Sequence, residues 1–113
     1  MISIYHNNRC SKSRDSLALL TQQNIEIKVI DYLKNPPTEK QIKTLLKKLK
    51  MKPLELLRKS ENLYKDNYKE INLSDDEWIE LMANNPILIE RPIIMNGNKA
   101  VIGRPPEKVL EIL

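Results

Sequence analysis

The residues that could do chemistry gather in the stretch 5–20, around the only cysteine of the chain, Cys10. A short β-branched run and a polar loop precede this cysteine, and a helical pattern begins directly after it. The N-terminus of a helix presents unpaired N–H groups and a partial positive charge, which favour a thiolate over a thiol and also favour a bound oxyanion. Its cationic and imidazole neighbours in sequence are His6, Arg9, Lys12 and Arg14. We therefore expect a thiol of lowered pKa that acts as a nucleophile.

Cys10 and His6 each have a structural alternative to a catalytic role. A lone cysteine after a strand is often a small buried hydrophobic residue, and a loop histidine is often held by hydrogen bonds without taking part in a reaction. Four charged or imidazole neighbours would be poor lining for a core, which favours the reactive interpretation. A single cysteine excludes an internal disulfide and an internal resolving thiol, so a redox cycle through Cys10 must use a second thiol from another molecule.

The length and composition indicate one soluble domain. The 113 residues are 41% hydrophobic and 30% charged, which is ordinary for a globular protein with a single modest core. No secretory pattern precedes Ile2, and no apolar run approaches the length of a membrane span. A single cysteine also fits a reducing compartment. The chain is therefore expected to be cytoplasmic and to have no membrane partner.

The net charge of +4 and the pI near 9.2 raise the question of a nucleic-acid partner. Much of the excess lies in lysines that alternate with leucines at helical spacing, which is typical of a solvated helix face. Aromatic residues make up only 4% of the chain, so there is little platform for base stacking. We expect no nucleic-acid partner, and the charge suits a small anionic substrate equally well. The lysines are Lys40, Lys43, Lys47, Lys48, Lys50 and Lys52.

Hydrophobic periodicity predicts a β-α-β unit at the start of the chain. A strand over 2–5 is followed by a helix that runs to about Gln23, with an apolar stripe and a stop at Asn24. Alternation of apolar and charged residues over 25–30 predicts the second strand. Two strands joined through a helix are expected to be parallel, with a right-handed crossover. The helical stripe consists of Leu17, Ala18 and Leu20.

Residues 36–87 are predicted to form a helical insertion between two halves of a small sheet. Two of its helices should begin at Thr38 and Ser74, each with a glutamine or glutamate three residues on that completes a capping box. Pro53 suits the first position of another short helix, and the region 63–68 predicts a short helix or turn. The apolar side chains expected to face inward in the second half are Leu54, Leu57, Trp78, Leu81 and Met82.

A β-β-α unit is predicted to close the chain. Strands over 92–95 and 99–102 flank Asn96-Gly97, a strong hairpin signal. A helix over 107–113 should follow, with Val109, Leu110 and Leu113 on its inner side. The predicted fold class is therefore α/β, with β-α-β and β-β-α units around the helical insertion, in a single domain over residues 1–113.

This order resembles the thioredoxin and glutaredoxin fold. Four separated motifs resemble the glutaredoxin-coupled arsenate reductases of the ArsC family, and within that family its arsenate reductase-like branch. The resemblance covers nearly the whole chain. The motifs are HNNRCSKSR at 6–14, LLRKSE at 56–61, NPILIERPI at 85–93 and IGRPPE at 102–107. The best-characterised loops of that family read Asn-Pro-X-Cys-Gly-Thr-Ser-Arg, whereas this chain has Asn8 in place of the proline and Ser11-Lys12 in place of Gly-Thr. By the same resemblance Pro92 is expected to follow a cis peptide bond.

The resemblance implies a role for each of seven residues. Cys10 corresponds to the catalytic thiolate, with His6 near it and Arg14 positioning it, and Ser13 helps to hold the anion. Three arginines supply the planar, permanently charged donors that suit a tetrahedral oxyanion. These anion-binding arginines are Arg58, Arg91 and Arg104.

The implied activity is a glutathione- and glutaredoxin-dependent reduction of arsenate. Cys10 attacks arsenate, glutathione releases arsenite, and glutaredoxin resolves the mixed disulfide left on Cys10. No metal and no bound cofactor are expected, and glutathione is a co-substrate. Two alternatives stay open: a general glutathione-linked thiol oxidoreductase, and a transcription regulator that binds RNA polymerase as the Spx proteins do. The Spx proteins usually carry a Cys-X-X-Cys switch, which this chain lacks.

Overall fold

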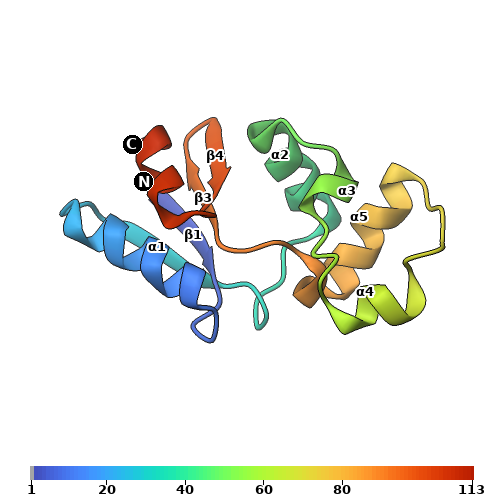
Figure 1. Cartoon of the computed structure of the whole chain (residues 1–113). Helices are drawn as coiled ribbons and strands as arrows, with labels where there is room; N and C mark the ends of the chain where they lie inside the picture. The colour runs from blue at the N-terminus through green and yellow to red at the C-terminus, as the bar shows by residue number, and fades with distance from the viewer. Residues whose placement is uncertain (1) are drawn as a thin grey trace. The chain divides into compact units, whose positions relative to one another are not determined.

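A computed structural model describes residues 2–113 (Figure 1). The chain folds into two compact units. The first contains the residues up to Asn35 together with Arg91–Leu113, and the second contains Pro36–Glu90. The second unit begins at the residue where the helical insertion is predicted to begin. All the strands of the described sheet belong to the first unit, and we describe that unit first.

The first unit contains a four-stranded sheet in the order β2-β1-β3-β4. Strand β1 (Ile2–His6) pairs in parallel with β2 (Ile27–Asp31), as the β-α-β prediction requires. It pairs on its other side with the antiparallel strand β3 (Ile93–Asn96), which in turn pairs with β4 (Lys99–Ile102). The predicted α/β class with β-α-β and β-β-α units is therefore confirmed.

The core of this unit lies on one face of the sheet. Because side chains alternate along a strand, Ile2 and Ile4 of β1 share that face with Ile94 of β3. Helix α1 (Ser11–Gln22) and the C-terminal 3-10 helix η2 (Pro106–Ile112) pack on this face, and Figure 1 shows the ribbons of both beside β1 and β3. The burial of apolar area on this face is the main term that stabilises the unit.

Helix α1 packs on the sheet through small polar residues as well as through leucine. Its buried residues are Ser13, Ser16 and Leu20, which recur at helical spacing. Ala18, which was expected in the apolar stripe, is exposed, so this part of the prediction was wrong. Two of the three buried residues are serines, which a search for apolar residues at helical spacing does not count. The predicted stripe therefore included Ala18 in their place.

Ser16 lies against Gly103, at the end of β4. The Ser16 hydroxyl donates a hydrogen bond to the Gly103 carbonyl oxygen at 3.3 Å. A Cβ atom at position 103 would overlap the Ser16 Oγ atom and would come within 3.0 Å of Pro92 Cγ. The N–H of Gly103 also donates to the Pro92 carbonyl at 2.9 Å. A glycine is therefore required here by the close approach of α1 to the hairpin.

The C-terminal helix is wound more tightly than the sequence predicts. The segment Pro106–Ile112 is a 3-10 helix, in which side chains three residues apart lie on the same side. Val109 and Ile112 are accordingly buried, three residues apart. Leu110 and Leu113 are 46% and 43% exposed, so their predicted inward positions, which assumed an α-helix, were wrong.

The hairpin between β3 and β4 is present, with its turn one residue later than expected. Asn96 pairs with Lys99, so the two central residues are Gly97 and Asn98. Gly97 has a φ of +61°, which a glycine at the first central position of a type II′ turn readily adopts.

The second unit consists of short helices. They are α2 (Glu39–Leu49), α3 (Pro53–Leu56), α4 (Asn62–Asn67), α5 (Asp75–Asn84) and the 3-10 turn η1 (Pro86–Leu88). Both predicted capping boxes are present, at Thr38 and at Ser74. Trp78 is 2% exposed and packs against Tyr64 and Tyr68. The centroid of its ring lies 6.4 Å from the ring centroid of each tyrosine.

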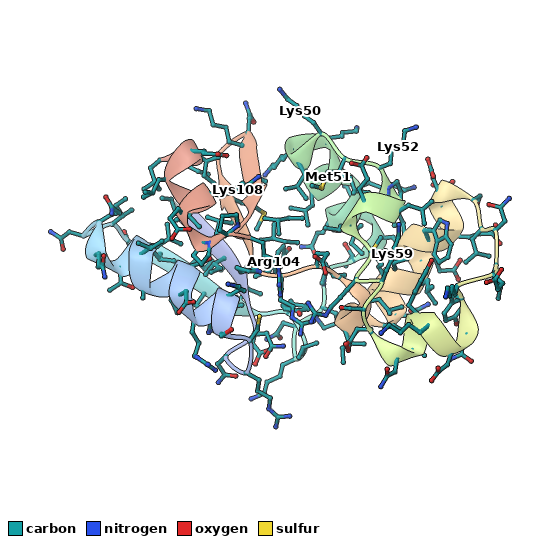
Figure 2. All side chains as sticks on the ribbon, viewed as in Figure 1. Lys50, Met51, Lys52, Lys59, Arg104 and Lys108 are labelled. Atoms are coloured by element: carbon teal, nitrogen blue, oxygen red, sulfur yellow. The ribbon has the colours of Figure 1, made fainter. Side chains whose placement is uncertain are left out.

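In this unit the prediction for Leu54 was wrong, whereas the prediction for the lysine-rich face of α2 agrees with the structure. Leu54 is 41% exposed, because α3 is a single turn that buries Leu56 and is followed by the buried Leu57; the inward position predicted for Leu54 was wrong. The lysine-rich face of α2 lies opposite the buried Ile42, Leu45 and Leu46, as a solvated face should. Figure 2 shows Lys50 and Lys52, just beyond α2, extending outward from the ribbon.

Over residues 2–113, no helix is both long and apolar enough to span a bilayer.

Replacing Gly103 by alanine tests the close approach of α1 to β4. The added methyl group should lower the free energy of unfolding by about 1–3 kcal/mol, since overpacking of a filled site has this cost. Combining Gly103→Ala with Ser16→Ala should destabilise less than the sum of the two single changes, because the second change removes the overlapping hydroxyl. Urea unfolding of the four proteins measures this. Strictly additive losses would show that the two residues do not crowd each other.

Candidate active site

Cys10 occupies the N-cap of α1, where the loop after β1 meets the helix. Its backbone N–H donates to the Asn7 carbonyl at 2.9 Å, and its carbonyl accepts from the Arg14 N–H at 3.0 Å. The side chain is partly exposed. The structure therefore places the thiol at the position predicted from the sequence, fixed by the backbone at the positive end of a helix and within reach of solvent.

Three groups stabilise the thiolate form of Cys10. Burial by itself raises the pKa of this thiol, but the Ser13 N–H, a hydrogen bond from Arg91 and the charges of Arg91 and Arg104 outweigh burial and lower the pKa below its ordinary value. The Arg104 Nη2 atom lies 3.5 Å from the sulfur. The expectation of a lowered thiol pKa is therefore confirmed.

The charges that act on the sulfur come from the distant end of the sequence. Arg9, Lys12 and Arg14, which flank the cysteine, have exposed side chains, and the Arg14 Nη1 atom donates to the Asn8 carbonyl at 2.8 Å. The lowered pKa was expected from the N–H groups at the start of the helix and from these neighbours. The first part is confirmed, because the Ser13 N–H lowers the pKa, but the charges that lower it are those of Arg91 and Arg104, which lie in two distant Arg-Pro motifs.

Arg91 and Arg104 are held together at the open end of the β3–β4 hairpin. Arg91 directly precedes the Pro92 of its cis peptide bond, so the predicted cis Pro92 is confirmed, and a second cis bond joins Arg104 to Pro105. The Arg104 Nε atom donates to the Arg91 carbonyl at 2.6 Å. Figure 2 labels Arg104, which follows β4. The hairpin thus carries both guanidinium groups to one place.

Part of the Arg91 guanidinium lacks an acceptor. Its Nε and Nη1 atoms are buried and find no hydrogen-bond partner among residues 2–113. A buried donor without an acceptor costs free energy, more so when it is charged. An oxyanion bound beside Cys10 could supply these acceptors, because guanidinium groups bind oxyanions through paired N–H donors.

His6, the last residue of β1, and Ser13, in the first turn of α1, form a second set of contacts. The Ser13 hydroxyl lies 2.6 Å from His6 Nδ1 and accepts from the Asn7 N–H at 3.0 Å. Burial lowers the pKa of His6, the Asp31 carboxylate raises it, and the Arg14 charge lowers it, with a net decrease. A neutral imidazole can accept the Ser13 proton at Nδ1, which leaves the serine free to accept from Asn7. These bonds connect the end of β1 with the first turn of α1.

Arg58 lies in the second unit, among carboxylates. Its Nε atom is 3.7 Å from Glu61 Oε2 and its Nη1 atom is 3.7 Å from Glu90 Oε1. The Arg58 N–H also donates to the Leu88 carbonyl at 2.6 Å. The anion-binding role that the resemblance implies for Arg58 stays a prediction. Within residues 2–113 no cluster of three or more histidine, cysteine, aspartate and glutamate side chains could hold a metal ion.

Alkylation of Cys10 as a function of pH tests the origin of its lowered pKa. The rate with iodoacetamide should reach half its maximum at a lower pH than for the same thiol in the urea-unfolded chain, and it should fall as the pH drops through that midpoint. Arg104→Met should move the midpoint upward. Lys12→Met, which removes one neighbouring charge in sequence, is the matched control and should leave the midpoint nearly unchanged. Equal shifts for both variants would contradict the assignment to Arg104.

Known proteins resemble this chain over its full length. The family model of the ArsC family matches residues 5–112. The uncharacterized protein YfgD of Escherichia coli K12 is 47% identical, over 99% of this chain and 96% of that protein. An arsenate reductase of Haemophilus influenzae is 42% identical, over 99% of this chain and 98% of that protein.

Solved structures agree with the sequence comparisons. The structure of an arsenate reductase from Vibrio cholerae matches with a TM-score of 0.95 and 46% identity, over 99% of this chain and 97% of that one. A second structure, of an ArsC family related protein from Bacteroides fragilis, matches with a TM-score of 0.86 at 21% identity and shows the fold alone. With a thiol at the start of α1, a thioredoxin-like sheet and this full-length similarity, the chain belongs to the ArsC family.

Proposed function

We propose that this protein is a glutathione- and glutaredoxin-dependent arsenate reductase. The observation that carries the proposal is the partly exposed Cys10 thiol of lowered pKa beside Arg91, whose buried Nε and Nη1 atoms have no acceptor in residues 2–113. A nucleophile and unsatisfied oxyanion donors at one point suit a substrate that is both an electrophile and an oxyanion. The arsenate reductases among the relatives support this choice of substrate.

The first step is attack of the Cys10 thiolate on the arsenic atom of arsenate. A sulfur–arsenic bond forms and one arsenate oxygen leaves as water after taking up protons. Negative charge on the remaining oxygens would be offset by Arg91 and Arg104, and the N–H groups at the start of α1 add to this field. His6, Ser13 and Arg14 are proposed to hold the loop in the attacking geometry through the contacts described above.

The second step reduces the arsenic and the third restores the thiol. Glutathione attacks the cysteine-bound adduct, arsenite leaves with arsenic reduced from the +5 to the +3 state, and the two sulfurs are oxidised to a mixed disulfide between Cys10 and glutathione. A glutaredoxin thiolate then attacks the glutathione sulfur and releases the Cys10 thiolate. An external thiol is needed because this chain has a single cysteine.

Replacing Cys10 by serine tests the nucleophile. The wild-type protein, with glutathione, glutaredoxin, glutathione reductase and NADPH, should oxidise NADPH in proportion to the arsenate added. Cys10→Ser should reduce that rate to the level of the buffer control, because a serine hydroxyl is not ionised at neutral pH. If arsenate is not reduced by the wild-type protein while Cys10 still forms a glutathione adduct, the protein is a general thiol oxidoreductase instead.

Replacing the arginines one at a time tests the oxyanion site. Arg91→Ala and Arg104→Ala should each lower kcat/KM for arsenate by about ten- to hundredfold, the loss expected for a hydrogen bond to a charged group. Arg58→Ala tests the role that the family resemblance gives to that residue. Lys28→Ala, which removes an exposed cation from β2, is the control and should have little effect. Unchanged kinetics for both Arg91→Ala and Arg104→Ala would contradict the proposed oxyanion site.

A further inference from the structure

A cavity of about 350 Å³ lies beside the loop that holds Cys10. Its walls come from the loops that follow β1 and β2, and because these strands are parallel with His6 opposite Asp31, both loops leave the same end of the sheet (Figure 1). Ends of parallel strands at one sheet edge are a common place for ligands. The lining residues are Asn7, Asn8, Arg9, Asp31, Leu33 and Lys34.

The cavity adjoins the reactive cysteine through the backbone. Asn7, one of the lining residues, accepts the hydrogen bond from the Cys10 N–H at 2.9 Å, and Arg9 is the residue next to the cysteine. A volume of this size is within the range of about 300–1,000 Å³ that is usual for small-ligand sites. A ligand in the cavity would therefore lie next to the loop that presents the thiolate.

The charged groups of the cavity form a mixed set, with two cations and one carboxylate. The cations are Arg9 and Lys34, and the carboxylate is Asp31. The Asp31 Oδ1 atom accepts from the N–H groups of Leu33 and Lys34 at 3.2 and 3.4 Å, so the turn after β2 fixes the carboxylate. The Asn7 Oδ1 atom accepts from the Arg9 N–H at 3.0 Å, which fixes the opposite wall.

We propose that this cavity binds glutathione, the co-substrate in the function proposed above, on which this inference rests. Glutathione carries two carboxylates and one ammonium group, and these match the two cations and the one carboxylate of the lining. Leu33 offers an apolar surface for the methylene groups of the tripeptide. A bare oxyanion such as arsenate fits this cavity less well, since Asp31 would repel it. Co-substrate and oxyanion would thus use different groups around Cys10.

Bound there, glutathione exchanges with Cys10 in a step that can be followed without arsenate. The Cys10 thiolate attacks one sulfur of glutathione disulfide, the new bond joins Cys10 to one glutathione, and the second glutathione leaves as its thiolate. One disulfide is exchanged for another, so no further oxidant is needed. The rate of this step should depend on the cavity only when the disulfide carries the charges of glutathione.

The test compares two disulfides, glutathione disulfide and the uncharged 2-hydroxyethyl disulfide. The rate of mixed-disulfide formation on Cys10 is measured by mass spectrometry for the wild-type protein, for Arg9→Met, Lys34→Met and the double variant, and for the control Lys28→Met. Dividing the glutathione rate by the hydroxyethyl rate removes any change in the reactivity of the thiolate itself. The ratio should fall about three- to fivefold in each single variant and about tenfold in the double variant.

The outcomes separate this inference from the proposed function. A ratio that is unchanged in the double variant, or that falls equally in Lys28→Met, overturns the glutathione site. A protein that does not reduce arsenate but shows the expected fall in the ratio keeps the glutathione site and loses the arsenate substrate. Reduction of arsenate with an unchanged ratio keeps the proposed function and places the glutathione elsewhere.

Discussion

Burial alone favours the neutral form of a thiol. A partly buried thiolate therefore needs nearby positive charges or hydrogen-bond donors. At Cys10 the opposing groups are one backbone N–H, from Ser13, and the two guanidinium groups of Arg91 and Arg104. The two arginines stand before β3 and after β4, and the pairing of β3 with β1 brings that end of the hairpin to the loop after β1. The order and pairing of the strands thus bring the charges of Arg91 and Arg104 close to the sulfur atom of Cys10.

The N-termini of α1, α2 and α5 differ in which groups satisfy their backbone N–H donors. The first turns of α2 and α5 carry acidic residues and capping boxes, which satisfy the N–H groups and offset the helix dipole within the chain. The first turn of α1 carries no acidic residue, and the side chain at its N-cap is the Cys10 thiol, whose thiolate form the Ser13 N–H stabilises. The positive end of α1 is therefore available to a thiolate and an anion, whereas the corresponding ends of α2 and α5 serve stability.

Features set by local sequence were predictable, and features set by distant partners were less so. The capping boxes at Thr38 and Ser74 and the helix start at Cys10 depend on residues a few positions apart, and the structure contains them. The 3-10 winding of Pro106–Ile112 buries Val109 and Ile112 together, and periodicity alone does not distinguish it from an α-helix. The two arginines reach the sulfur only through strand pairing, so their motifs could suggest a role but not a contact with Cys10.

The contact between Ser16 and Gly103 links packing to the position of Arg104, the next residue in the chain. An added Cβ atom at Gly103 would overlap the Ser16 Oγ atom, so the spacing between α1 and the end of β4 leaves no room for a side chain at position 103. Evolutionary drift at one position is consequently tied to the other, and a mutation that enlarges either would have to be accommodated by its partner before the guanidinium could return to the sulfur. Selection for a guanidinium beside Cys10 would then also act on a buried serine and glycine.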